Sequence, residues 1–229
     1  MKYEVIIFDA DETLFDFEKA EKVAFINLLK EYNFEDIDYI YEAYRKINLL
    51  IWQEFEQGLI TQNALKTERF LRLSKQLNLD FKADIMAKRF TPHLANASYL
   101  YPESLELVKR LSKDYRLLII TNGLKEIQEK RISSSIIAPY FEAIIISEVV
   151  MVAKPDPKIF EYALEAINYH NKSKVLMVGD SITSDIKGGI NFGIDTCWYN
   201  PHKVNNHTNI KPTYIINSLF ELDKIIKSH

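Results

Sequence analysis

Cysteine and long hydrophobic runs are the scarcest features of this sequence. Its 229 residues include one cysteine, Cys197, so the chain cannot form an internal disulfide. Its apolar runs are far shorter than the roughly 20 residues that a membrane-spanning helix needs. The first residues, MKYEVIIFDAD, lead straight into a strand-like run and not into a cleavable signal sequence. We therefore expect a soluble, cytoplasmic protein.

Blocks of like charge are also absent. The 29 Lys and Arg residues nearly balance the 32 Asp and Glu residues, and neither set gathers in one stretch. Nucleic acid is therefore not expected as the main partner. Apolar residues make up 47% and aromatic residues 12% of the chain, which is typical of a globular protein with a sizeable core.

Short apolar runs rich in Ile and Val recur along the chain, and after the first of them they alternate with stretches of helical periodicity. Continuous apolar runs of this kind are typical of parallel strands that are covered on both faces. The pattern predicts an α/β fold with a doubly wound parallel sheet, a Rossmann-like core. The predicted strands are Val5–Phe8, Leu117–Ile120, Ala143–Ile146, Val175–Val178, Thr196–Tyr199 and Tyr214–Ile216.

The interval from residue 17 to residue 98 breaks this alternation, because it contains no strand-like run. Its apolar positions fit one face of a helix better than they fit the alternation of a strand. We therefore predict an all-helical domain inserted after the first strand. Residues 1–15 and 99–229 are assigned to the α/β core and residues 16–98 to the helical insertion.

Two carboxylates follow the first predicted strand, in the segment Asp9-Ala10-Asp11-Glu12-Thr13. In open parallel sheets, ligands bind at the carboxyl ends of the strands, so Asp9 and Asp11 are expected at the mouth of a site. Two carboxylates this close repel each other unless a cation or a shared proton compensates, which favours a metal. An acidic turn without a function is the alternative.

The second and third predicted strands are also followed by polar residues. Thr121-Asn122-Gly123 supplies a hydroxyl, an amide and backbone N–H groups that can hold a phosphate. Lys154, which follows the third strand and precedes Pro155, supplies a positive charge. An ordinary turn and a solvated lysine are the alternatives for these two segments.

The fourth predicted strand leads into Gly179-Asp180, and Asp185 follows five residues after Asp180. Mg²⁺ prefers a few carboxylate oxygens while it keeps several waters and a substrate phosphate, and Asp180 suits this role. Asp185 has a second interpretation as the cap of the helix that follows it. Each segment alone is weak evidence for a functional site, but all four lie at the ends of successive predicted strands.

Together these segments resemble the four motifs of the haloacid dehalogenase superfamily. The motifs are DxDxT at Asp9–Thr13, the strand-terminal Thr121, Lys154 before a proline, and GDxxxxD at Gly179–Asp185. The resemblance implies a magnesium-dependent phosphatase, which moves a phosphoryl group from a small phosphate monoester to an aspartate and then to water. The helical insertion resembles the cap domain that closes over the substrate in that superfamily.

The resemblance also implies a role for each residue of these motifs. Asp9 would be the nucleophile, and Asp11 the general acid and then the base. An aspartyl phosphate divides one difficult displacement into two easier ones, and Mg²⁺ and Lys154 would supply the positive charge that an attack between anions needs. The implied phosphate-binding residues are Thr121, Asn122, Gly123 and Lys154, with Asn122 and Gly123 acting through backbone amides. The implied metal ligands are Asp9, Asp11 through its backbone carbonyl, Asp180 and Asp185.

Within the superfamily, the sequence is similar to the pyrimidine 5'-nucleotidase branch. That branch acts on pyrimidine nucleoside monophosphates, noncanonical ones included, so the similarity implies a nucleoside monophosphate as the substrate. Glu12 is a departure from the superfamily, much of which has glycine at this position. The similarity to the branch is carried by Asp9–Phe15, Trp52, Gly58, Ile120–Gly123, Ile146–Glu148, Val152–Pro155, Val178–Asp180 and Cys197-Trp198.

Other functions fit parts of this pattern. A sugar-phosphate phosphatase or phosphomutase is the main alternative, because it shares every core motif. A 2-haloacid dehalogenase is less favoured, since a halide leaving group needs no acid such as Asp11 and that branch lacks the second Asp and the magnesium. A protein that is not an enzyme is a further alternative, namely a binding module that keeps the fold without turnover. The complete set of catalytic residues argues against it.

Aromatic side chains in or beside the helical insertion have two interpretations. They can stack on a nucleobase, or they can pack the helices against one another. The residues concerned are Phe15, Phe17, Trp52, Phe55 and Phe90.

Overall fold

The computed structural model describes residues 2–227 of the chain. These residues form two compact units. One unit comprises the described residues up to Phe17, Tyr99–Lys125 and the described residues from Ile132 onward, and the other comprises Glu18–Ser98 and Glu126–Arg131. In the part of the chain that is described, no helix is both long and apolar enough to span a bilayer.

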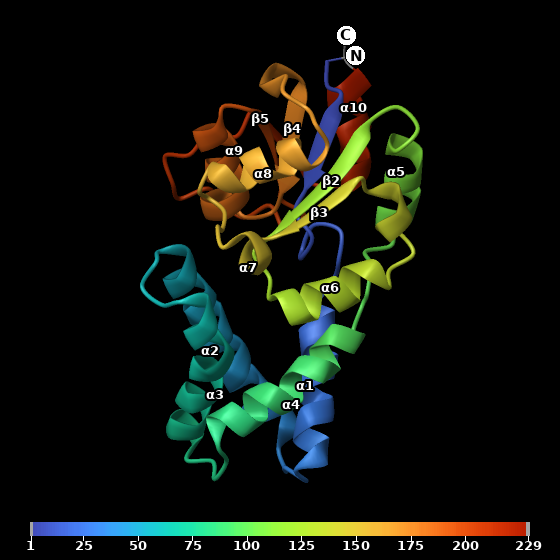
Figure 1. The fold of residues 1–229 in the computed structure, drawn as a ribbon. Coiled ribbons are helices and arrows are strands. Elements are labelled where there is room, and N and C mark those ends of the chain that lie inside the picture. Colours follow the sequence, from blue (N-terminus) through green and yellow to red (C-terminus); the bar gives the residue numbers. More distant parts are fainter. Residues whose placement is uncertain (1, 228–229) are drawn as a thin grey trace. The chain divides into compact units, whose positions relative to one another are not determined.

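The first unit is built on a parallel sheet, which has six strands within residues 2–227. The strands are β1 (Val5–Phe8), β2 (Arg116–Thr121), β3 (Ala143–Ile146), β4 (Val175–Gly179), β5 (Asp195–Tyr199) and β6 (Tyr214–Ile216). Their order across the sheet is β3-β2-β1-β4-β5-β6, and every neighbouring pair is parallel (Figure 1). The predicted α/β fold with a doubly wound sheet is therefore confirmed.

Helices of the first unit cover both faces of this sheet. They are α5 (Ser104–Leu111), α7 (Ser147–Val150), α8 (Lys158–Ala166), α9 (Lys187–Phe192) and α10 (Leu222–Lys227), with helical turns η1 (Ala138–Tyr140), η2 (Lys172–Lys174), η3 (Ile182–Ile186) and η4 (Leu219–Glu221). Ile6 of β1 shares one buried cluster with Leu107 of α5 and Leu222 of α10. Ile7 shares the other cluster with Phe160 of α8 and Phe192 of α9. Successive strand residues point to opposite faces, so the continuous apolar run of β1 is buried on both sides.

The strand order reverses at β1. The chain runs from β1 to β2 and β3 on one side, and then returns to β4 on the other side of β1. Phe8, the last residue of β1, is paired with Ile119 of β2 and Val178 of β4, so the residues that follow these strands meet at one edge. Ligands bind in open α/β sheets where the strand order reverses. This topology places Asp9 at the expected position of a site.

The second unit is packed around aromatic rings. Its long helices are α1 (Phe17–Glu31), α2 (Ile37–Glu56), α3 (Gln62–Leu77) and α4 (Ala83–Asn96). Phe25 stacks on Tyr44 with ring centroids 4.0 Å apart, and Phe90 meets both rings edge-on. Residues 17–98, all of them described, contain helices and turns and no strand. The predicted all-helical insertion is therefore confirmed.

A buried polar network links α1, α2 and α3 within this unit. Glu21 accepts hydrogen bonds from Asn48 Nδ2 at 2.6 Å and from the Tyr44 hydroxyl at 3.2 Å. Arg69 donates through Nη1 to the Tyr44 hydroxyl at 3.3 Å and to Asn48 Oδ1 at 3.4 Å. A buried polar group that lacks a partner costs about 1–3 kcal/mol, so this network favours one register of the three helices.

The helix α6 (Lys125–Ser133) begins in the first unit, but its residues 126–131 belong to the second unit. The buried Arg131 donates from Nε to the Ala97 carbonyl and from Nη1 to Gln128 Oε1, both at 3.0 Å. The Ser98 hydroxyl donates to the Arg131 carbonyl at 2.8 Å. These bonds hold α6 to the segment that follows α4, whereas the sequence analysis assigned all of α6 to the core.

Candidate active site

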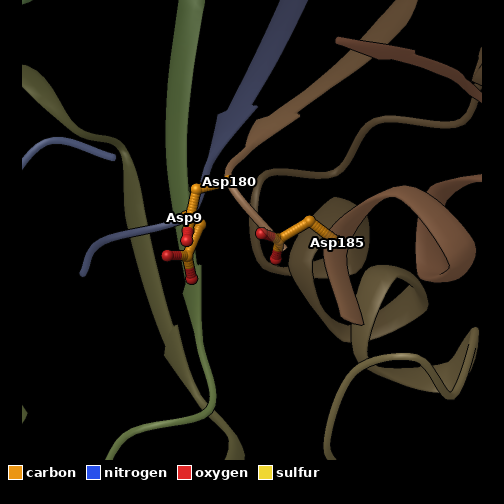
Figure 2. A group of neighbouring side chains, drawn as sticks. All are labelled: Asp9, Asp180 and Asp185. Atoms are coloured by element: carbon orange, nitrogen blue, oxygen red, sulfur yellow. The ribbon is translucent and has the colours of Figure 1, made fainter. Parts of the chain in front are cut away.

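Three carboxylates converge at the carboxyl ends of β1 and β4. Asp9 follows β1, Asp180 follows β4, and Asp185 lies in the π-helical turn η3. One carboxylate oxygen of each residue lies within 4.8 Å of the others, and Figure 2 shows the three side chains near one another. The structure thus brings together three of the residues that the sequence analysis assigned to a metal.

The turn η3 directs Asp185 into this cluster. Ser181 caps the turn, because its hydroxyl accepts a hydrogen bond from the Ser184 N–H at 3.2 Å. Asp185 Oδ2 accepts from the Ser181 N–H at 3.0 Å, and the Asp185 side chain is 1% exposed. A Cβ atom on Gly179 would lie 2.2 Å from this oxygen, so the position before Asp180 needs glycine. Ser181, and not Asp185, is therefore the cap of this helical segment.

Lys154 lies at the centre of the site. Its Nζ contacts Asp9 Oδ1 at 2.5 Å, Asp185 Oδ1 at 2.7 Å and the Ile120 carbonyl at 2.7 Å. Burial acts to lower the pKa of Lys154, but the charges of Asp185 and Asp9 outweigh it and raise that pKa above its ordinary value. The alternative of a solvated surface lysine is therefore wrong, since Lys154 is a buried, charged partner of two carboxylates.

Crowding of negative charge makes this site suitable for a cation. Burial raises the pKa of Asp9 to about 8, with Asp185 and Asp11 adding to the increase and Lys154 opposing it. Burial and the charges of Asp185 and Asp9 raise the pKa of Asp180 well above its ordinary value. Lys154 supplies one positive charge against three carboxylates, and hard oxygen donors suit Mg²⁺. These residues fit a divalent cation.

The loop after β2 contributes a hydroxyl and an amide. Thr121 is buried, and its hydroxyl accepts a hydrogen bond from the Gly123 N–H at 3.1 Å. The Asn122 side chain donates to the Lys154 carbonyl at 2.9 Å and accepts from the Lys154 N–H at 2.8 Å. The sequence offered the Asn122 amide as a phosphate ligand, and the family resemblance implied a role for its backbone N–H; the structure adds that its side chain contacts the backbone of Lys154.

The loop after β1 holds Asp11, Glu12 and Thr13. Asp11 is partly exposed, and its carboxylate is not part of the group of three around the candidate metal site. The Thr13 hydroxyl is buried and donates to Asp180 Oδ1 at 3.3 Å. Thr13 therefore links the β1 loop to the β4 loop, and Asp11 stays closer to solvent.

Glu12 adopts a backbone conformation that favours glycine. Its φ is +57°, in the left-handed region that costs a residue with a side chain roughly 1–2 kcal/mol. The Tyr101 hydroxyl donates to the Glu12 carboxylate at 2.5 Å, and this bond offsets part of the cost. Burial and the contact with Glu12 raise the pKa of Tyr101, so its hydroxyl keeps the proton that it donates.

The aromatic residues fall into two groups. Phe15 and Phe90 are fully buried in the cores of their units, so their role is packing. Trp52 and Phe55 are partly exposed and lie edge-to-face with ring centroids 5.9 Å apart, and Phe17 is also partly exposed. Trp52, Phe55 and Phe17 retain surface that a base could contact.

Comparison with known proteins identifies the family of this chain and two relatives that match nearly its whole length. Residues 3–193 match the family of haloacid dehalogenase-like hydrolases, and the chain belongs to that family. PynA, a pyrimidine 5'-nucleotidase of Streptococcus pneumoniae, is 39% identical over 97% of this chain and 94% of its own length. YjjG, a pyrimidine 5'-nucleotidase of Escherichia coli, is 36% identical over the full length of both chains.

A solved structure of the same family shows how closely the fold is shared. The crystal structure of YfnB, a hydrolase of this family from Bacillus subtilis, was obtained with bound magnesium and reveals interdomain movement. It is 33% identical to this chain and superimposes with a TM-score of 0.94, covering 99% of this chain and all of YfnB. The superfamily predicted from the four motifs is therefore confirmed, and the protein is an enzyme, a hydrolase.

Proposed function

We propose that this enzyme is a magnesium-dependent phosphomonoesterase that acts through an aspartyl phosphate on Asp9. The observation that carries the proposal is the contact of Lys154 Nζ with Asp9 at 2.5 Å, inside a cluster that also contains Asp180 and Asp185. A carboxylate that is buried and paired with a fixed cation, at the reversal of the strand order, is suited to attack a bound phosphate.

The proposed reaction has two steps. A carboxylate oxygen of Asp9 attacks phosphorus, the bond from phosphorus to the leaving oxygen breaks, and Asp11 gives that oxygen a proton. Asp11 then takes a proton from water, whose oxygen attacks the same phosphorus, and the bond between phosphorus and Asp9 breaks. Phosphate leaves, and Asp9 is again a carboxylate. The partial exposure of Asp11 suits an acid and base that must meet both the substrate and water.

Residues around Asp9 hold the phosphate and the metal in this proposal. Lys154 and the hydroxyl of Thr121 stabilise the negative charge of the transferring group, together with the backbone amides of Asn122 and Gly123. When bound, Mg²⁺ neutralises phosphate charge and keeps Asp9 ionised. The proposed metal ligands are Asp9, the Asp11 carbonyl, Asp180 and Asp185.

We further propose that the substrate is a pyrimidine nucleoside 5'-monophosphate. PynA and YjjG, which match nearly the whole chain, are pyrimidine 5'-nucleotidases, and Trp52 and Phe55 offer partly exposed aromatic surface in the helical unit. The helical unit is proposed as a cap that closes to exclude water during the reaction. The interdomain movement seen for YfnB supports such a role.

A panel of phosphate monoesters tests the substrate. We expect dUMP, dTMP and UMP to be hydrolysed with a higher kcat/KM than AMP, GMP or hexose phosphates at one Mg²⁺ concentration. A purine in a pocket shaped for one ring must displace side chains, which costs about 1–3 kcal/mol, or roughly 5- to 150-fold in rate. If a purine nucleotide or a hexose phosphate leads the panel by about tenfold, the nucleotidase proposal is wrong and only the phosphatase proposal remains.

The pH dependence of Mg²⁺ binding tests the metal site. The pKa of Asp9 is raised to about 8 and that of Asp180 is raised as well, so without a cation protons compete for these carboxylate oxygens. Mg²⁺ competes with those protons, so its apparent dissociation constant should rise as the pH falls below about 8, by roughly tenfold per pH unit if one proton is displaced and more steeply if two are. Titration calorimetry at pH 6, 7 and 8 measures this.

The variant Asp180→Ala is the matched test of the same site. It should bind Mg²⁺ more weakly than the wild type at each pH, because it lacks one carboxylate of the cluster. A wild-type affinity that is unchanged across the three pH values, or an unchanged affinity in Asp180→Ala, would contradict the proposed ligands.

A further inference from the structure

We propose that the side chain of Asn122 is a positioning residue that sets Lys154 against Asp9. Its Nδ2 donates to the Lys154 carbonyl at 2.9 Å, and its Oδ1 accepts from the Lys154 N–H at 2.8 Å. A single amide thus engages both backbone groups of one residue, which lies in a different loop. This inference deepens the proposed function and rests on the role of Lys154 in it.

A third contact joins this pair to the next loop of the site. Asn122 Nδ2 also donates to the hydroxyl of Ser184 at 3.3 Å, and Ser184 is 4% exposed. Ser184 directly precedes Asp185 in the turn η3. The Asn122 amide therefore connects the loops that follow β2, β3 and β4, which carry Thr121, Lys154 and Asp185.

The position of the Lys154 backbone decides where its ammonium group lies. Nζ has three oxygen partners within 2.7 Å, on Asp9, Asp185 and Ile120. The Lys154 side chain is only 1% exposed, and close packing around its stem leaves little room to compensate for a backbone shift, so these three contacts hold together only if the backbone of Lys154 stays in place. The two hydrogen bonds between the Asn122 side chain and the Lys154 backbone supply that restraint. A displacement of about 1 Å at a reacting group can cost roughly 100-fold in rate.

A double-mutant cycle tests this coupling in the full-length enzyme with Mg²⁺ and p-nitrophenyl phosphate. We expect Asn122→Ala to lower kcat/KM by about 10- to 100-fold in the wild-type background. In a Lys154→Met background, the same change should lower the residual activity by less than about threefold, because the group that Asn122 positions is gone. An equal factor in both backgrounds would overturn the proposal.

Asn200 provides a matched control for loss of the same kind of hydrogen bonds. Its Nδ2 donates to the Val204 carbonyl at 3.0 Å, and its Oδ1 accepts from the Val204 N–H at 2.9 Å. Asn200→Ala should lower the melting temperature by an amount similar to Asn122→Ala while kcat/KM stays within about twofold. An activity loss in Asn200→Ala as large as that in Asn122→Ala would mean that general loosening explains both, and would overturn the proposal.

Hydrogen exchange gives a readout that does not depend on turnover. The Lys154 amide should exchange faster in Asn122→Ala than in the wild type, while Asn122→Asp, which keeps the acceptor oxygen but sets a second oxygen against the Lys154 carbonyl, should give intermediate protection. Unchanged exchange in Asn122→Ala would show that Asn122 does not hold Lys154. If the wild type hydrolyses no phosphate monoester, the proposed function fails, and this exchange result still decides whether Asn122 fixes the Lys154 backbone.

Discussion

Replacing Asp9 with asparagine is expected to abolish turnover, with kcat falling roughly 10⁴-fold or more, as for loss of other enzymic nucleophiles. An amide is nearly the same size as a carboxylate but does not attack phosphorus. Its oxygen can still accept a hydrogen bond from Lys154, which also keeps its contact with Asp185 at 2.7 Å. The fold should therefore persist, and steady-state assays with UMP alongside circular dichroism measure the two effects.

The matched control for this change is Asp114→Asn. Asp114 is exposed in the turn before β2, at the end of the strands opposite the site, so its substitution should leave kcat within about twofold because surface changes rarely have large effects. Activity of Asp9→Asn above about one per cent of the wild type, with fresh protein of verified mass, would rule out Asp9 as the nucleophile.

Replacing Asp11 with asparagine is expected to give a loss that depends on the leaving group. General acid catalysis contributes about 10²- to 10⁴-fold, and the alkoxide of a nucleoside leaves poorly without a proton. For UMP, kcat should therefore fall by about that factor. For p-nitrophenyl phosphate, whose phenolate leaves readily, the fall should be less than about tenfold in the step that forms the phosphoenzyme.

Pre-steady-state kinetics with substrate in excess separate this first step from the hydrolysis that follows, for both substrates. The burst of the leaving group, p-nitrophenol or uridine, reports the proposed phosphoryl transfer to Asp9, and the later steady phase reports the step in which Asp11 is proposed to act as a base. Equal losses on the two substrates in the first step would contradict the acid role of Asp11, while leaving the role of Asp9 untouched.

The fold could be predicted from the apolar runs, and the grouping of the candidate site residues could be predicted because each of them follows the end of a strand. Parallel strands place their carboxyl ends at one edge of a sheet, so the polar residues after four apolar runs had to meet. The register of β1 with β2 and β4 brings the residues after Phe8, Ile119 and Val178 together. The sequence could not decide between a metal ligand and a helix cap for Asp185, and the capping contact of Ser181 excludes the cap.

Side-chain contacts between distant loops could not be predicted. The amide of Asn122 pairs with Lys154, which is 32 residues away in the chain, and no periodicity or motif spacing records such a pairing. The hydrogen bond from Tyr101 to Glu12 could not be predicted for the same reason, since the two residues are 89 positions apart in the sequence, with the helical insertion between them. The burial of Arg69 has a signal in the sequence, because Arg69 lies on the same helix face as the apolar residues Leu65 and Phe70. The sequence does not show which residues it contacts.

A crystal structure of the enzyme soaked with beryllofluoride and Mg²⁺ tests directly whether Asp9 accepts the phosphoryl group. Beryllofluoride mimics a phosphoryl group, so it should attach to a carboxylate oxygen of Asp9, with Lys154 and Thr121 as its nearest polar side chains. The proposed aspartyl phosphate predicts that attachment in the wild type and none in Asp9→Asn. Density for the group at any other residue, or equal binding in the two proteins, would contradict the mechanism.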